Sequence, residues 1–185
     1  MNTTHNENTQ IRNLAYSGIC LSLCLVLPFL TGQIPQIGAA LCPMHLPVLL
    51  AGFLCGPWWA AVIGITAPLL RHILFGMPPI LTAIAMVFEL LTYGLVSGIL
   101  YRVLPKKVSS IYLALIGAMI SGRIVWGVVQ VVILGLSHST FTWALFWAGA
   151  IVNAIPGIIV QLVLIPILVV ALQHAHYIPK RNPIA

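Results

Sequence analysis

Apolar runs of about twenty residues follow one another along most of this chain, separated by short stretches rich in Pro, Gly or charge. About twenty apolar residues are what an α-helix needs to cross the hydrocarbon core of a bilayer. Of the 185 residues, 61% are hydrophobic and 5% are charged, whereas roughly a quarter of a soluble domain is charged. A soluble domain and a disordered chain are therefore excluded, and the alternation of barrel strands is not seen. The sequence predicts an all-α, polytopic membrane protein embedded in a lipid bilayer.

The breakers between the apolar runs divide one membrane domain, residues 13–176, into about six spanning helices. The predicted helices cover residues 13–30, 45–55, 60–75, 82–103, 110–134 and 142–173. Polar tails precede and follow this domain, at residues 1–12 and 177–185. The first tail is a poor signal-peptide n-region, so we expect the first apolar run to be retained as a helix. The last helix contains Pro156 and Pro166, where we expect it to tilt or kink.

Lysine and arginine are distributed unevenly among the predicted loops. If the N-terminus is cytoplasmic, all the loop and tail cations fall on the inner side: Arg12, Arg102, Lys106, Lys107, Lys180 and Arg181. The opposite loops, around residues 33–36, 77–79 and 137–140, carry no Lys or Arg. The positive-inside rule then places both termini in the cytoplasm. Because the basic residues are scattered and form no basic face, we expect no nucleic-acid partner.

Three ionisable side chains, Arg71, Glu89 and Arg123, interrupt the membrane segments. Each costs about 2.5–3.5 kcal/mol at the centre of a bilayer on insertion scales, so each should face the bundle interior and find a partner. In the predicted orientation, Arg71 and His72 lie at the outer end of their helix and Glu89 about two turns inward. Arg123 lies near the middle of its helix, and Asn153 lies at a depth similar to Glu89. We therefore expect these polar groups to converge on the outer half of the bundle.

Two interpretations of the buried charges stay open. Glu89 and Arg123 form an ion pair that only pins two helices together, or they belong to an outward-facing polar site in which Arg71 or Arg123 meets an anionic or polar ligand. Two arginines against one carboxylate leave a positive surplus, which favours a ligand with a carboxylate or another acceptor. For Arg71, snorkelling to the membrane interface is the alternative.

His45 and Trp126 complete the candidate site. His45 follows Cys42 and Met44 at the outer start of the second helix, and all three residue types can bind soft metals. A lone His at a helix entrance is more typical of a cap or a ligand hydrogen-bonder, so we expect no metal. Trp126, one turn from Arg123, is a candidate wall that stacks on a ring. The candidate substrate-binding residues are His45, Arg71, His72, Glu89, Arg123, Trp126 and Asn153.

No catalytic constellation is seen in the sequence. A nucleophile with its base, HExxH, GxSxG and Walker A patterns are all missing, so we expect neither an enzyme nor a cofactor. Uphill transport would then draw its energy from an ion gradient or from a partner. The competing hypotheses are an intramembrane scaffold with a structural Glu89–Arg123 pair, and a small intramembrane enzyme with a nucleophile near His45 or His72.

Six segments of the chain resemble the substrate-binding S components of energy-coupling factor (ECF) vitamin transporters. They are residues 43–57, 68–71, 75–79, 85–90, 122–127 and 153–157. The resemblance implies a six-helix protein of a prokaryotic plasma membrane that binds a water-soluble vitamin or related micronutrient from outside. It implies a binding site beneath the loop joining the first two helices and the loop after the third. It also implies a transmembrane coupling subunit and two ATPase subunits as partners, which would supply the missing energy source.

The resemblance bears on docking and on the ligand. The family docks through an Ala-x-x-x-Ala motif on the first helix; here Ala15 is followed by Ile19, and the nearest match is Gly18-x-x-x-Ser22. Ala15, Gly18 and Ser22 are therefore the candidate docking residues.

A pantothenate-like acid suits the positive surplus, and a ring with N–H donors, such as a queuosine precursor or a pterin, suits Glu89 beside Trp126. Cobalt and nickel relatives carry a Met-His pair at the very N-terminus, whereas in this chain the pair is internal, which argues against metal.

Overall fold

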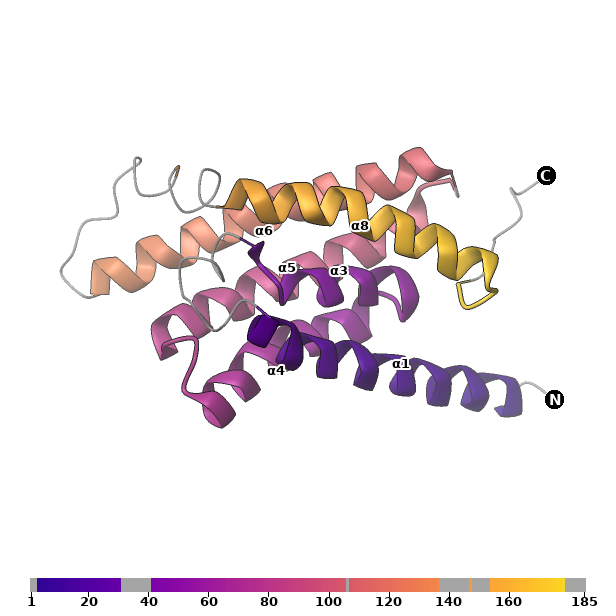
Figure 1. The fold of residues 1–185 in the computed structure, drawn as a ribbon, viewed down its shortest axis with the longest axis horizontal. Coiled ribbons are helices and arrows are strands. Elements are labelled where there is room, and N and C mark those ends of the chain that lie inside the picture. The colour runs from indigo at the N-terminus through magenta and orange to yellow at the C-terminus, as the bar shows by residue number, and fades with distance from the viewer. Residues whose placement is uncertain (1–2, 31–40, 106, 137–146, 148–153, 179–185) are drawn as a thin grey trace.

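A computed structural model describes residues 3–30, 41–105, 107–136, 147 and 154–178 (Figure 1). Every regular element in these residues is a helix, which confirms the all-α prediction for the described part of the chain. The helices are α1 (Thr3–Leu30), α3 (His45–Leu54), α4 (Pro57–Phe75), α5 (Ile80–Val103), α6 (Val108–Leu136) and α8 (Ile155–His174).

Five of the described helices are long and apolar enough to cross a membrane, which makes the chain a multi-pass membrane protein. The exception is α3, whose 10 residues span about 15 Å, half of the roughly 30 Å hydrocarbon core. Six spans and the cytoplasmic placement of both termini stay predictions.

Two helix boundaries differ from the predicted ones for identifiable reasons. The first helix begins at Thr3 rather than at residue 13, because polar residues such as Gln and Glu support a helix as well as apolar ones do. The last helix begins at Ile155, with Pro156 in its first turn, where a missing N–H breaks no helical hydrogen bond. Pro156 thus starts α8 and does not kink it. Residues 142–146 and 148–153 of the predicted last helix lie outside the described residues.

Helix α5 packs against α3, α4 and α6, and small residues let α4 approach it closely. A Cβ atom added to Gly94 would lie 2.7 Å from the backbone carbonyl of Ala60, and one added to Gly64 would lie 2.6 Å from that of Leu90. Close backbone approach of this kind drives helix association in lipid, where apolar side chains gain little from leaving the bilayer. The small residues Ala60, Gly64 and Gly94 therefore let α4 pack closely against α5, the helix that carries Glu89.

Helix α3 lies inside the bundle and contacts α1, α4, α5 and α8. Val48, Leu49 and Ala51 are completely buried, so its apolar sequence is satisfied by protein rather than by lipid. The chain then reverses at Gly56, whose φ of 93° is a backbone conformation that favours glycine. This short helix is what places His45, at its first position, in the bundle interior.

The two ends of the bundle differ in charge. The start of α1, the junction between α5 and α6, and the end of α8 lie together at the right of Figure 1, and the turn between α4 and α5 lies at the opposite end. Arg102 and Lys107, both exposed, belong to the α5–α6 junction. The described junction cations thus share an end with the start of α1, as the sequence predicts. Which side of the membrane this end faces stays a prediction.

Candidate functional site

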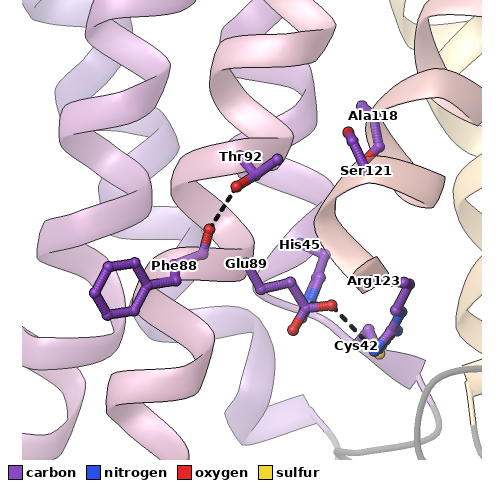
Figure 2. A network of polar contacts seen from close by, with 8 residues as sticks. All are labelled: Cys42, His45, Phe88, Glu89, Thr92, Ala118, Ser121 and Arg123. Carbon is purple, nitrogen blue, oxygen red and sulfur yellow. Dashed lines mark hydrogen bonds and ion pairs between the residues drawn. The ribbon is translucent and has the colours of Figure 1, made fainter. Parts of the chain in front are cut away.

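Three helices bring ionisable side chains together around Glu89 (Figure 2). Glu89 lies on α5 and is 2% exposed. Its Oε1 atom lies 3.0 Å from Nη1 of Arg123 on α6 and 3.3 Å from Nε2 of His45 on α3. The structure therefore joins three of the predicted site residues in one buried cluster.

Two further residues surround this cluster, Cys42 and Tyr93. Nη2 of Arg123 donates to the Cys42 sulfur at 3.5 Å. The Tyr93 ring lies edge-on to His45, with 5.2 Å between ring centroids. Neither residue is among the candidate substrate-binding residues predicted from the sequence. Tyr93 was detectable, because it follows Glu89 by one helical turn and so lies on the same face of α5.

The cluster is under-satisfied in hydrogen bonds. Among the described residues, the atoms Glu89 Oε1, Arg123 Nε and both ring nitrogens of His45 are buried without an aligned hydrogen-bond partner. The 3.0 Å contact of Glu89 with Arg123 and its 3.3 Å contact with His45 thus lack hydrogen-bond geometry. An unsatisfied buried polar group costs about 1–3 kcal/mol. These unpartnered atoms leave the cluster able to form further hydrogen bonds.

A glycine beside Arg123 allows α6 to approach α5 at this level. A Cβ atom on Gly122 would collide with the Tyr93 ring and would lie 3.3 Å from the backbone oxygen of Glu89. Because Gly122 has no side chain, Arg123 is brought next to Glu89 rather than held a side-chain width away. The absence of a side chain at Gly122 also leaves room for the Tyr93 ring.

The Met44 backbone carbonyl, next to His45, accepts a hydrogen bond from the thiol of Cys24 on α1 at 3.6 Å. The Cys24 thiol is completely buried. The segment that carries His45 is therefore attached to the buried face of α1 as well as to α5.

Arg71 contacts α1 and its own helix. Its Nη1 donates to the backbone oxygen of Leu25 at 2.6 Å. Its guanidinium lies over the rings of Phe29 and Phe75, at 5.0 and 5.4 Å from their centroids. The residue is 3% exposed. Arg71 thus fastens the end of α1 to the end of α4.

Arg71 and Glu89 lie at different depths in the bundle. Gly64 of α4 lies against Leu90 of α5, and the two helices run antiparallel through the short turn at residues 76–79. Arg71 is therefore level with residue 83 of α5, six residues before Glu89, which amounts to about 9 Å along the helix axis. The sequence predicts a positive surplus from two arginines beside one carboxylate. The described contacts of Glu89 include Arg123 but not Arg71, so they do not show this surplus.

Three predicted site residues remain: His72, Trp126 and Asn153. His72 Nδ1 hydrogen-bonds the backbone oxygen of Pro78 at 2.8 Å and so stabilises the turn between α4 and α5. Trp126 lies on α6 one turn after Arg123 and is partly buried. Asn153 lies outside the described residues. Within the described ranges, no three His, Cys, Asp or Glu side chains are grouped as metal ligands.

The candidate docking residues Ala15, Gly18 and Ser22 are all exposed on α1. The Ser22 hydroxyl donates to the backbone oxygen of Gly18 at 2.9 Å, and a Cβ on Gly18 would meet nothing within 4 Å. Their neighbours Ile19 and Val26 are exposed as well, at 59% and 56%. No other described helix covers this apolar, small-residue face.

Replacing Arg71 with glutamine is expected to loosen the end of α1. The change removes a charged hydrogen bond, worth about 1.5–3 kcal/mol, and two cation–ring contacts. Pro28 already deprives this end of one helical hydrogen bond. Amide hydrogen exchange at residues 27, 29 and 30 should accelerate at least about tenfold, because each 1.4 kcal/mol is a factor of ten. Leu74→Ala, at a side chain 55% exposed on the same turn of α4, is the control; equal exchange in both variants would show that Arg71 does not hold α1.

Comparison with known proteins identifies the family. Searches of curated proteins and of solved structures each found no match. A sequence model of the family described as ECF transporter, substrate-specific component, matches residues 12–169. The match runs from α1 into α8 and contains Glu89, Arg123 and His45. The chain therefore belongs to the substrate-specific components of ECF transporters, membrane subunits that bind the transported substrate and are not enzymes.

Proposed function

We propose that this chain captures a water-soluble vitamin or related micronutrient from outside a prokaryotic cell and delivers it inward with ATP hydrolysed by partner subunits. The ligand classes proposed are a pantothenate-like acid and a queuosine-precursor-like ring. The partners proposed are a transmembrane coupling subunit and two ATPase subunits, in the plasma membrane. The chain would cross that membrane six times with both termini in the cytoplasm.

The observation that carries the proposal is the under-satisfied cluster of Glu89, Arg123 and His45. Its three side chains come from three helices. Glu89 and His45 are almost completely buried and the Arg123 side chain is 14% exposed, which is a costly placement for ionisable groups within a membrane. A ligand that hydrogen-bonds the unpartnered atoms would offset part of this cost. Family membership supplies the reason for such a site, because a substrate-specific component must bind a substrate.

The test is the recovery of a small molecule from the purified protein. The chain is expressed with and without the coupling module, purified in mild detergent, and its small molecules are extracted and identified by mass spectrometry. We expect one water-soluble compound near a one-to-one ratio, retained by Ser121→Ala, whose hydroxyl bonds only backbone oxygens of its own helix. Wild-type protein that carries no compound and binds none from a vitamin mixture would remove the proposal and favour the scaffold hypothesis.

The exposed face of α1 supports docking on the coupling subunit. We expect Gly18→Leu to reduce co-purification of the coupling subunit at least about tenfold, because the added side chain holds the two backbones apart. Folding should be unchanged within about 0.5 kcal/mol, since nothing lies within 4 Å of a Cβ at this position. The measurement is pull-down of the complex together with thermal unfolding of the isolated chain.

Gly135→Leu is the matched control for docking, because Gly135 on α6 is equally open. It should keep the complex. Intact co-purification in the Gly18 variant would place the docking surface elsewhere on the chain.

A further inference from the structure

We propose that the ligand presents an uncharged hydrogen-bonding edge, with a donor beside an acceptor, to Glu89, Arg123 and His45, and that Glu89 is the residue that excludes a carboxylate from this position. A lactam or amide edge has this chemistry. The inference rests on the proposed function and chooses between the two ligand classes named there.

The charges of Glu89 and Arg123 compensate each other. Arg123 has a close charged partner, because Glu89 Oε1 lies 3.0 Å from its Nη1 atom. Glu89 is one of only two acidic residues in the chain, and the other, Glu7, precedes the membrane domain. Arg71 adds no charge at this depth, since its level is about 9 Å nearer the α4–α5 turn. The cluster is thus a compensated pair and has no surplus cation for an anionic ligand.

The unpartnered atoms of the cluster differ in hydrogen-bonding capacity. Arg123 Nε can only donate, and the ionised Glu89 Oε1 can only accept. Each nitrogen of the His45 ring takes either role, depending on the tautomer. A ligand edge that satisfies both Arg123 and Glu89 must therefore carry an acceptor and a donor side by side. A carbonyl next to an N–H meets this requirement.

A carboxylate fails on both counts. It offers acceptors only, so Glu89 Oε1 would stay unsatisfied. It would also be placed within a few ångströms of the Glu89 charge in a site that water does not screen. Arg123 without Glu89 would bind such a group well, because a guanidinium pairs with carboxylates through two parallel hydrogen bonds. Glu89 therefore determines which charge the site accepts.

The experiment compares wild type, Glu89→Gln and Thr92→Val. Thr92 lies one turn along α5, and its hydroxyl bonds the backbone oxygen of Phe88 (Figure 2), so it is a matched control. Cells are fed a defined mixture of water-soluble vitamins and nucleobases that contains acid and amide forms of the same compounds. Mass spectrometry then measures what each purified variant retains.

We expect wild type and Thr92→Val to retain the same compound, with a lactam or amide edge, within about twofold. Glu89→Gln should retain at least about 30-fold less of it and a larger share of acids, because Arg123 is then uncompensated. A second measurement needs no variant: the retained compound methylated at its edge nitrogen lacks the donor and should bind wild type at least about 100-fold more weakly.

The outcomes separate this inference from the proposed function. If wild type retains no compound, the proposed function fails, and this inference fails with it. If wild type retains an acid whose only polar edge is its carboxylate, or if N-methylation leaves binding unchanged, the function stands and the inference is overturned. If Glu89→Gln folds and retains the same compound as wild type, Glu89 does not set specificity.

Discussion

Replacing Glu89 with alanine is expected to lower the free energy of unfolding by about 3–5 kcal/mol and to abolish ligand retention. Removal of the carboxylate leaves Arg123 as a buried cation without its 3.0 Å partner. It also removes the acceptor that lies against His45. The measurement is denaturant unfolding in detergent, together with mass spectrometry of retained small molecules.

A double replacement separates a structural pair from a binding site. In Glu89→Leu/Arg123→Leu the charges leave together, so stability should return to within about 1 kcal/mol of wild type, because apolar substitutes for a buried pair are often neutral or stabilising. Ligand retention should stay lost. A double variant that is stable and still retains the ligand would show that the pair only joins α5 to α6.

Replacing Gly94 with leucine is expected to prevent correct packing of α4 against α5. A Cβ at this position would lie 2.7 Å from the backbone of Ala60, and the rest of a leucine side chain would extend further into α4. Backbone atoms cannot move aside as a side-chain tip does, so the helices must separate. We expect a loss of at least about 4 kcal/mol or failure to fold. The measurements are the thermal midpoint and elution as a single species in detergent.

Gly135→Leu tests whether the loss at Gly94 comes from crowding. It introduces the same side chain at an open glycine on α6. Its stability should match wild type or rise by up to about 1 kcal/mol, because leucine favours a helix more than glycine does. Equal stability of the Gly94 and Gly135 variants would contradict the close α4–α5 contact.

The membrane class and most helices follow from the sequence because hydrophobic length is a local property. The predicted segments 60–75 and 82–103 differ from α4 and α5 by only a few residues. The errors at helix ends have local causes too: polar residues extend α1, and Pro156 is compatible with the first turn of α8. Hydropathy does not predict how far a helix extends beyond the bilayer.

Part of the candidate site was predictable from the cost of burying charge. Charged side chains within membrane segments need partners in the protein, and the structure pairs Glu89 with Arg123. The partner of Arg71 was not predictable, because a backbone carbonyl on α1 has no signature in the sequence. Cys42 was equally hidden, since its contact with Arg123 joins residues 81 positions apart. Such contacts depend on how the helices pack, which hydropathy does not determine.

The attachment of Met44 to Cys24 has a mechanical consequence. His45, which touches Glu89, is the next residue after a carbonyl held by α1, whose far side carries Gly18. A solute that displaces the His45 imidazole would also move the Met44 carbonyl and, through its hydrogen bond with Cys24, helix α1. Ligand binding at the Glu89 cluster would thus shift the exposed face of α1. The ligand-bound and ligand-free subunits would then present different surfaces to the rest of the transporter.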